Sequence, residues 1–290
     1  MKRLPLLIGS ILFLLVLTGC GRTDTNPQIA ATTLPVYEFT AQLCHGTDIT
    51  VTRLITEDVS CLHDYTLQVK QMRIIEGSQV IVTSGAGLED FLEDAIRSAH
   101  ALIDASEGIS LHCGHTHDHQ DSHHHESDPH IWLSPKNAKH MAQNICNGLI
   151  QQYPQHEMLF LANLELLEAE LDDLSDYADI QLSQLSSREL ITFHDGFSYM
   201  AEAFDLTIVH AIEEESGSEA SAAELIQLIQ IVESHRLQAI FTERSGSTSA
   251  ASVVSAETGA KLFVLDMAMS GSSYFEAMYH NIDILKEALE

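Results

Sequence analysis

The segment Phe160–Leu185 reads FLANLELLEAELDDLSDYADIQLSQL and determines how the rest of the chain is organised. Its apolar residues recur every three or four positions, at Phe160, Leu164, Leu167, Leu171, Leu174, Ala178, Leu182 and Leu185. This spacing places them on one face of a helix, and no Gly or Pro interrupts it. We therefore predict one helix over residues 155–187, about 45 Å long at a rise of about 1.5 Å per residue. Such a helix can run the length of a protein with two lobes.

Strands alternate with helices on both sides of this segment. The predicted strands are Ile29–Thr33, Ile49–Ile55, Gln79–Thr83 and Ala101–Asp104, then Glu189–Phe193, Leu206–Ala211, Ala239–Thr242 and Leu262–Leu265. The predicted helices are Tyr37–Leu43, Tyr65–Glu76, Leu88–Ser98 and Pro135–Gln152, then Ser198–Phe204, Ala222–His235, Ser249–Glu257 and Tyr274–Leu289. This alternation indicates βαβ units with parallel sheets. We predict an α/β fold of two lobes, residues 29–154 and 188–290, joined by the single long helix.

The N-terminal residues have the pattern of an export signal. A basic pair, Lys2-Arg3, precedes an apolar run, Leu4–Leu17, that is short for a transmembrane helix. The run ends in Leu17-Thr18-Gly19-Cys20, which resembles a bacterial lipoprotein signal; an ordinary signal peptide with a chance cysteine is the alternative. We predict a signal peptide over residues 1–19, lipidation of Cys20, and a tether over residues 20–28. The mature chain would then be held outside the cytoplasm, on the bacterial cell membrane, by its lipid.

The composition excludes a disordered chain and argues against nucleic acid as a partner. Hydrophobic residues make up 45% of the sequence, and their regular spacing is typical of packed elements. Acidic residues number 42 and basic residues 14, so the formal net charge is −28. The phosphates of nucleic acids require a basic surface, whereas an acidic protein attracts cations. The same charge also promotes simple solubility.

One segment, residues 112–130, is dense in histidine. It reads HCGHTHDHQDSHHHESDPH and contains eight of the 17 histidines of the chain, together with four acids. Neutral imidazole is the commonest protein ligand of zinc, copper and nickel, so this composition predicts contact with a transition metal. A solvated polar loop is the alternative, since a purification tag would be a pure histidine run at a terminus. The spacing His115-x-His117-Asp118-His119 is not that of the dinuclear metallohydrolases.

Four cysteines follow Cys20, at positions 44, 61, 113 and 146. Outside the cytoplasm an even number permits disulfides. Cys44 and Cys61 flank one predicted strand and are the favoured pair. Cys113 lies inside the histidine-rich segment and is equally suited to be a metal ligand, and the sequence does not decide between these roles.

A glycine-rich turn, Gly85-Ala86-Gly87, invites comparison with nucleotide-binding loops. It lacks the third glycine of the dinucleotide fingerprint, and the acids that follow it, Glu89-Asp90, would repel a phosphate. We predict a simple turn. The sequence also contains neither a Gly-x-Ser-x-Gly elbow nor a His-Glu-x-x-His pair.

Three histidines, one of them the last of the histidine-rich segment, lie near acids where predicted loops meet strand ends: His63-Asp64, Asp128-Pro129-His130 and His194-Asp195. Asp266 ends another predicted strand. Ligands of parallel α/β folds bind at the carboxyl ends of the strands, so these residues are candidates for a binding site. Taken singly, each is more simply explained as a surface or capping residue.

Five motifs in order carry a resemblance to a known family. They are Leu62-His63-Asp64-Tyr65, Gly85-x-Gly87-Leu88-Glu89-x-Phe91, Asp128-Pro129-His130-Ile131-Trp132-Leu133, Phe193-His194-Asp195-x-Phe197-x-Tyr199, and Glu257-Thr258-Gly259-Ala260 before Leu265-Asp266. With the lipoprotein signal, they resemble the zinc- and manganese-binding solute-binding lipoproteins of ABC transporters, in particular those of zinc uptake. The resemblance runs from Ile29 to the end of the chain.

The resemblance implies a metal in the cleft between two lobes. Its four ligand positions correspond to His63 and His130 in the first lobe and to His194 and Asp266 in the second. Three imidazoles and one carboxylate suit tetrahedral Zn²⁺, whereas Mn²⁺ prefers more oxygen, and manganese-type members carry Glu at the position of His194. The resemblance also implies an accessory zinc loop over residues 112–125, whose histidines are His112, His115, His117, His119, His123, His124 and His125.

The expected function is capture of Zn²⁺ outside the cytoplasm by a monomer that delivers it to an ABC permease and its ATPase. A manganese or iron carrier of the same family is the first alternative, and an extracytoplasmic zinc hydrolase is the alternative from another class. A structural or adhesive lipoprotein, in which the metal only stabilises the fold, is the third. Cys44 and Cys61 depart from the family pattern: a disulfide could fix the approach of His63, or a free Cys61 thiolate could compete for the metal.

Histidine ligands make zinc binding sensitive to pH. Imidazole has an ordinary pKa of about 6.5 and must lose its proton to bind a metal. We therefore expect the zinc affinity of the purified protein to fall as the pH drops from 7 towards 5, measured by competition with a chelating dye at each pH. A binding constant that stays the same over this range would contradict a site dominated by histidine.

Overall fold

The structure is a computed structural model, and it describes residues 28–59, 62, 65–97, 100–112, 127–211 and 220–290. Several residues singled out in the sequence lie outside these ranges. They are the predicted signal peptide (1–19) and all but the last residue of the tether (20–28), with Cys20, and then Cys61, His63, Asp64, Cys113 and the accessory histidines His115, His117, His119, His123, His124 and His125.

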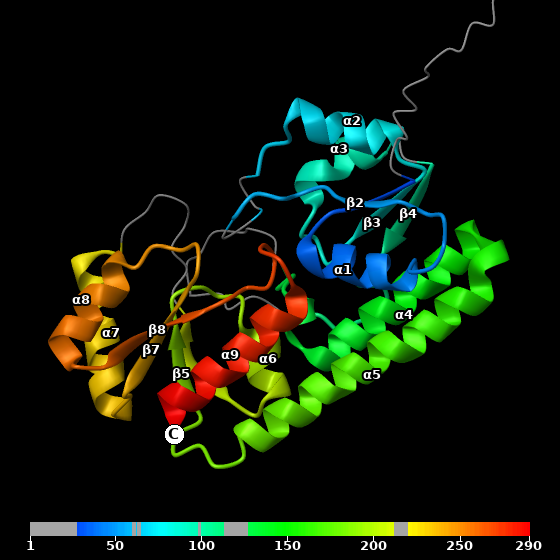
Figure 1. The fold of residues 1–290 in the computed structure, drawn as a ribbon. Coiled ribbons are helices and arrows are strands. Elements are labelled where there is room, and N and C mark those ends of the chain that lie inside the picture. Colours follow the sequence, from blue (N-terminus) through cyan, green and yellow to red (C-terminus); the bar gives the residue numbers. More distant parts are fainter. Residues whose placement is uncertain (1–27, 60–61, 63–64, 98–99, 113–126, 212–219) are drawn as a thin grey trace, which may run out of the picture.

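The first lobe contains a parallel sheet of four strands, with the order β2-β1-β3-β4. The strands are β1 (Ile29–Ala31), β2 (Val51–Arg53), β3 (Val80–Thr83) and β4 (Ala101–Asp104). The helices of this part are α1 (Leu34–Leu43), α2 (Val69–Gly77), α3 (Glu93–Ile96) and α4 (Pro135–Gln152), with 3-10 turns η1 (Asp90–Leu92) and η2 (Ile131–Leu133). Helices α2 and α3 lie on one side of the sheet, and α1 and α4 lie on the other (Figure 1).

The second lobe repeats this arrangement with the strand order β6-β5-β7-β8, again all parallel. Its strands are β5 (Glu189–Thr192), β6 (Thr207–Ala211), β7 (Ala239–Glu243) and β8 (Lys261–Leu265). Its helices are α6 (Ser198–Ala203), α7 (Ala222–His235), α8 (Ser249–Thr258) and α9 (Tyr274–Leu289). In both sheets the chain moves to one side after the first strand and then returns to the other. The order therefore reverses between β1 and β3 and between β5 and β7.

Helix α5 (Glu157–Gln181) follows a 3-10 turn, η3 (Pro154–His156), and runs from the first lobe to the second (Figure 1). It packs on α1 and α4 in the first lobe and on α9 in the second. The single long helix is confirmed, but it is shorter than the predicted 155–187. The apolar spacing of the sequence continues past the end of the helix because the Leu182 side chain still packs into the core. The Leu182 carbonyl accepts a hydrogen bond from the Arg188 guanidinium at 3.0 Å.

Two other predicted helices begin or extend differently. The helix predicted from Tyr65 begins at Val69, after Gln68, whose backbone N–H donates to the Gln71 side chain at 2.8 Å. The helix predicted over 88–98 is reduced to η1 and the short α3. Helix starts with strong local signals are confirmed: Ser134 caps α4 with Pro at the first position, and Ser221 caps α7.

One apolar core extends through both lobes. Trp132 of η2 and Tyr274 of α9 are fully buried in it. The Trp132 indole N–H donates to the Met267 carbonyl at 2.8 Å, and the Tyr274 hydroxyl donates to the Trp132 carbonyl at 2.8 Å. A second, smaller cluster lies within the second lobe and includes buried residues of α7 and α8. The lobes are therefore joined by packing as well as by α5.

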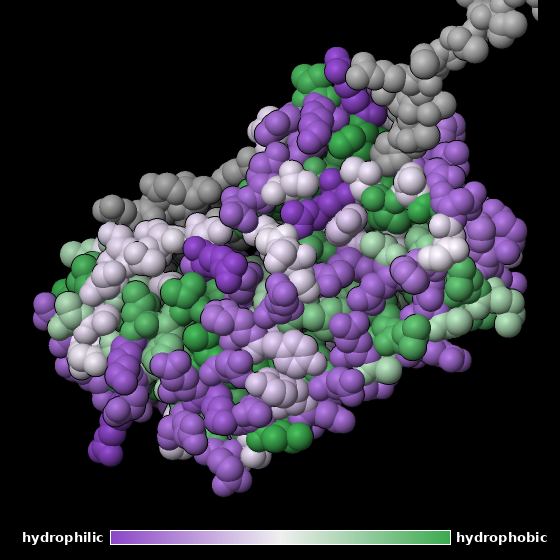
Figure 2. Space-filling model, in the orientation of Figure 1, coloured by the Kyte–Doolittle hydropathy of each residue, from purple (hydrophilic) through white to green (hydrophobic). Residues whose placement is uncertain are grey.

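The exposed surface is mainly hydrophilic on the face shown in Figure 2, with isolated hydrophobic residues. Two large hydrophobic side chains of α5, Leu166 and Met158, are 71% and 80% exposed. Within the described residues, none of the helices combines the length and apolar character needed to cross a membrane.

The core face of α5 should dominate its contribution to stability. Leu174 is fully buried, whereas Leu166 on the same helix is 71% exposed. We expect Leu174→Ala to lower the free energy of unfolding by about 2–5 kcal/mol, because it leaves a cavity in the shared core. The matched control, Leu166→Ala, should change it by less than about 0.5 kcal/mol. Urea unfolding measures both, and equal losses would contradict the packing described.

Candidate metal centre

His130 is held in place by a carboxylate two residues before it. Asp128 accepts a hydrogen bond from the His130 backbone N–H at 2.9 Å and lies 2.8 Å from its ring Nδ1. This is the local turn that an Asp favours when it bonds the backbone two residues on. His130 is only 3% exposed, and its ring is fixed by this contact. An Nδ1 proton shared with Asp128 leaves Nε2 as the nitrogen available to a metal.

Asp128 is itself positioned by the second lobe. The hydroxyl of Ser198 on α6 donates to its Oδ2, and the Tyr199 hydroxyl donates to its backbone carbonyl at 3.0 Å. Burial acts to raise the pKa of the Asp128 carboxyl, but the hydrogen bonds and charge of His130 and the hydrogen bond from Ser198 together lower it below its ordinary value. Asp128 is therefore ionised at neutral pH, as an orienting partner of an imidazole should be.

His194 lies just beyond β5 and faces His130. The two ring centroids are 5.2 Å apart, and the rings are almost perpendicular, at 84°. His194 Nδ1 is 3.7 Å from Oε2 of Glu243, a buried residue at the end of β7. Strands β5 and β7 flank the point where the strand order reverses, which is where open α/β sheets bind ligands.

Gly196 makes room for this arrangement. A Cβ at position 196 would lie 2.6 Å from His194 Cδ2 and 2.7 Å from Met267 Cε, closer than real side chains approach. A side chain at this position would therefore push His194 or Met267 aside. In the sequence, the only signal for Gly196 is its place two residues after a strand-end histidine, and this signal alone does not predict its role.

Asp266 follows β8 directly and is rigidly held. Its backbone N–H donates to the Asn281 side-chain oxygen, and the Asn281 amide donates to its carbonyl, both at 2.7 Å. One carboxylate oxygen, Oδ1, accepts from the Ala268 N–H at 2.8 Å. The other, Oδ2, lies 3.2 Å from Nε of Arg244. No sequence motif predicts Asn281, Arg244 or Glu243, which come from other parts of the second lobe.

The structure thus brings together two of the four predicted ligands, His130 and His194, one from each lobe. His63 lies outside the described residues. In the part of the chain that the structure describes, no group of three or more His, Cys, Asp or Glu is arranged to hold a metal ion. The complete ligand set therefore stays a prediction.

His112, at the start of the histidine-rich segment, is docked on α6. Its ring stacks on Tyr199 with 4.1 Å between centroids, its Nε2 is 2.8 Å from Glu202, and its Nδ1 is 3.2 Å from the Ser198 hydroxyl. The Asp128 N–H also donates to the His112 carbonyl at 3.0 Å. The base of the predicted accessory loop is thereby connected to the partner of His130.

The described cysteines are buried thiols. Cys44 and Cys146 are free, and burial raises their pKa values to about 12 and about 11. Such thiols are largely unreactive at neutral pH. The predicted partner of Cys44, Cys61, lies outside the described residues, so a disulfide between them stays a prediction.

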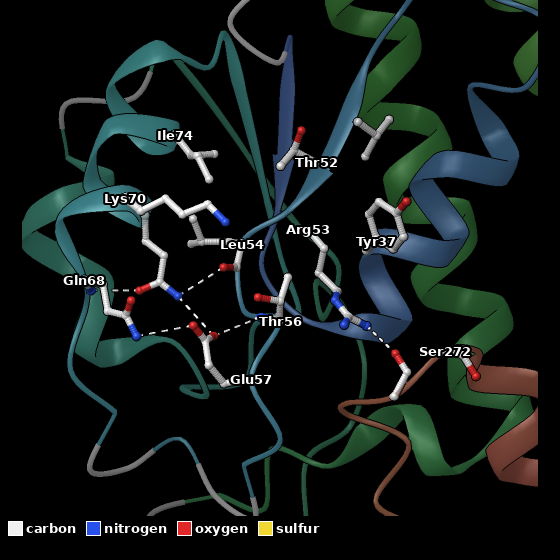
Figure 3. Close-up of a pocket in the computed structure, with 13 residues that line it drawn as sticks. Tyr37, Thr52, Arg53, Leu54, Thr56, Glu57, Gln68, Lys70, Ile74 and Ser272 are labelled. Atoms are coloured by element: carbon white, nitrogen blue, oxygen red, sulfur yellow. Dashed lines mark hydrogen bonds between the residues drawn. The ribbon is translucent and has the colours of Figure 1, made fainter.

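A separate cavity of about 490 Å³ lies between β2 and α2 of the first lobe and residues Gly271 and Ser272 of the second (Figure 3). Its lining includes two cations, Arg53 and Lys70, and one acid, Glu57. The Arg53 guanidinium crosses to the second lobe and donates to the Gly271 carbonyl at 2.9 Å. Two fixed positive charges disfavour a dication, and none of the predicted ligands lines this cavity. It is not the candidate metal centre.

The glycine turn after β3 binds one of the chain's own carboxylates. Glu89 is buried and accepts hydrogen bonds from the N–H groups of Ser84 at 2.7 Å and Gly85 at 3.0 Å. Burial raises its pKa to about 7. The Thr32 hydroxyl also donates to Glu89 at 2.5 Å. The N–H groups of this turn that could bind a phosphate are therefore already bonded to the Glu89 carboxylate.

Comparison with known proteins places the chain among zinc-uptake components. Residues 29–288 match the family described as ZnuA, zinc-uptake complex component A, periplasmic. The high-affinity zinc uptake system protein ZnuA of Bacillus subtilis (strain 168) is 29% identical over 304 residues, covering 96% of this chain and 94% of that protein. The zinc-binding lipoprotein AdcA of Streptococcus pneumoniae (strain ATCC BAA-255 / R6) is 29% identical over 310 residues, covering 100% of this chain but 62% of AdcA. A crystal structure of ZnuA aligns with a TM-score of 0.79 at 26% identity, over 91% of this chain and 99% of that one.

Two parallel-sheet lobes on one long helix, with a histidine from each lobe meeting between them, define a solute-binding protein for a metal ion. The chain belongs to the ZnuA family, the extracytoplasmic zinc-binding components of zinc uptake systems, which work with an ABC permease and its ATPase. The resemblance inferred from the sequence is confirmed, as are the two-lobed α/β fold and Zn²⁺ as the bound metal. Proteins of this family are substrate-binding proteins and not enzymes, so the family supports the zinc carrier over the manganese, iron and hydrolase alternatives.

The carboxylate of Asp128 should be needed for tight zinc binding. Asp128→Asn keeps the size of the side chain but removes the charge that orients His130, so we expect zinc affinity to fall about 10- to 100-fold. The control is Glu202→Gln, which removes a nearby carboxylate that contacts His112 instead. The affinity of Glu202→Gln for zinc at the tight site should equal that of the wild type. Competition with a chelating dye measures both variants, and an unchanged affinity in Asp128→Asn would contradict this role.

Proposed function

We propose that this protein captures Zn²⁺ between its two lobes, with His63, His130, His194 and Asp266 as ligands, and delivers it to an ABC permease. The observation that carries the proposal is the meeting of His130 and His194. Each comes from a different lobe, and each has Nδ1 turned towards a buried carboxylate. Metal-binding histidines commonly have such a partner, which fixes the ring and raises its basicity.

The proposed ligand set favours carriage of zinc. Three imidazoles and one carboxylate match the borderline ligands and tetrahedral geometry of Zn²⁺. Four protein ligands leave no open position for a reactive water, and an open position is what catalytic zinc sites retain. A closed site of this kind binds the ion without activating a nucleophile.

Ligands from both lobes make the metal a bridge between them. The interlobe hydrogen bonds of Trp132, Tyr274 and Arg53 limit how far the lobes can separate. Capture is therefore expected to involve small movements of loops and side chains rather than a wide closure. Release then requires the permease to draw the ligands of one lobe away from those of the other.

In our proposal the N-terminal residues and the histidine-rich loop also serve zinc capture. Residues 1–19 act as the signal peptide, Cys20 carries the lipid, and residues 20–28 tether the two-lobed part to the cell membrane. The lobes comprise residues 29–154 and 188–290, and the protein acts as a monomer. The loop over 112–125 gathers zinc near the cleft, since its base is docked beside Asp128 at His112.

The test is zinc titration with metal analysis on four proteins. These are the wild type, His194→Ala, a deletion of Ser110–Glu126, and the control His280→Ala, which removes an exposed histidine of α9. We expect His194→Ala to lose the tight site, because one imidazole ligand is gone. The deletion should keep the tight site and lose only additional weak zinc, and His280→Ala should match the wild type.

Two results would overturn this assignment. One is loss of the tight site in the loop deletion alone, which would place the ligands in the histidine-rich segment. The other is a tight site of unchanged affinity in His194→Ala.

A further inference from the structure

The ion pair between Arg244 and Asp266 places a positive charge at a proposed zinc ligand. Arg244 Nε lies 3.2 Å from Oδ2 of the Asp266 carboxylate. The backbone fixes this neighbourhood, because the Arg244 N–H donates to the Leu265 carbonyl at 2.9 Å. That bond continues the pairing of β7 with β8 one residue beyond the Glu243–Leu265 pair.

The Asp266 side chain is fixed by its surroundings, whereas the Arg244 side chain is free to move. Asp266 is buried, and its main chain and Oδ1 are held by Asn281 and Ala268. The Arg244 side chain is 58% exposed and follows the last residue of a strand. The guanidinium can therefore leave the carboxylate for solvent without any change in the strand, whereas the carboxylate stays where it is.

Zinc and Arg244 compete for the same carboxylate. Oδ1 of Asp266 already accepts a backbone hydrogen bond, so Oδ2 is the oxygen left for a metal, and Arg244 faces it. The guanidinium stays charged at all relevant pH values, so it repels a dication at short range. Binding of Zn²⁺ through Oδ2 requires the guanidinium to move away or to remain at an electrostatic cost.

We propose that Arg244 is a built-in counter-ion of Asp266, which occupies the carboxylate in the zinc-free protein and leaves it when zinc binds. Arg244 thereby weakens zinc binding and speeds its release, while it stabilises the empty site by neutralising a buried charge. This inference rests on the proposed function, because it takes Asp266 as a zinc ligand.

The test compares zinc affinity in variants that keep or remove the charge. We expect Arg244→Gln to bind zinc about three- to tenfold more tightly than the wild type, a moderate effect because the side chain is largely exposed. Arg244→Lys keeps the charge and should stay within about twofold of the wild type. The matched control is Arg97→Gln, which removes another exposed, ion-paired arginine, on the first lobe, and should have no effect.

A double-mutant cycle assigns the effect to Asp266. In an Asp266→Asn background, Arg244→Gln should no longer increase zinc affinity. A second measurement is thermal unfolding: without zinc, Arg244→Gln should be less stable than the wild type, and saturating zinc should raise its melting temperature by more. Zinc release into excess chelator should also be slower in Arg244→Gln.

The inference would be overturned by an unchanged or weaker affinity in Arg244→Gln, or by an equal gain in the Asp266→Asn background. Failure of the proposed function has a different signature. In that case the wild type would show no tight zinc site, or His194→Ala would bind zinc as the wild type does. A tight site in the wild type that needs His194 but ignores Arg244 would reject the counter-ion alone.

Discussion

Trp132 of the first lobe is hydrogen-bonded to two residues of the second lobe inside the shared core. Its indole N–H is bonded to the Met267 carbonyl, and its own carbonyl accepts from Tyr274. Trp132 is two residues after His130, and Met267 is one residue after Asp266. One buried hydrogen bond therefore sets the distance between a proposed ligand of each lobe. Without this fixed frame, a metal would first have to order two independent halves before binding could gain free energy.

The same frame explains how side chains of the second lobe organise a residue of the first. Ser198 and Tyr199 of α6 hold Asp128, and Asp128 holds His130. The orientation of one imidazole thus depends on packing between lobes. The His194 ring depends instead on contacts inside its own lobe, namely Glu243 and the close approach allowed by Gly196. A movement between lobes would disturb His130 more than His194.

Local signals in the sequence predicted most of the fold, and tertiary contacts account for the rest. The caps at Ser134 and Ser221 act within one turn of a helix, so residue identity alone was sufficient. The end of α5 was missed because Leu182 stays in the core after the helix stops, which spacing cannot reveal. At the site, strand-end histidines were visible in the sequence. Their partners Glu243, Arg244 and Asn281 are contacts between distant elements, which a single sequence does not encode in any local pattern.

The two sheets have the same strand order, but different residues occupy the point where that order reverses. In the second lobe the reversal point between β5 and β7 carries His194 and Glu243, and His194 faces His130 of the first lobe. In the first lobe the equivalent point, between β1 and β3, is plugged by Glu89, which takes the hydrogen bonds that a bound anion would use. The two sheets therefore have the same topology, but in the first lobe the reversal point is filled by the Glu89 side chain. The first lobe contributes His130 from the segment after β4 instead, so the two lobes use different parts of the same topology in the proposed metal site.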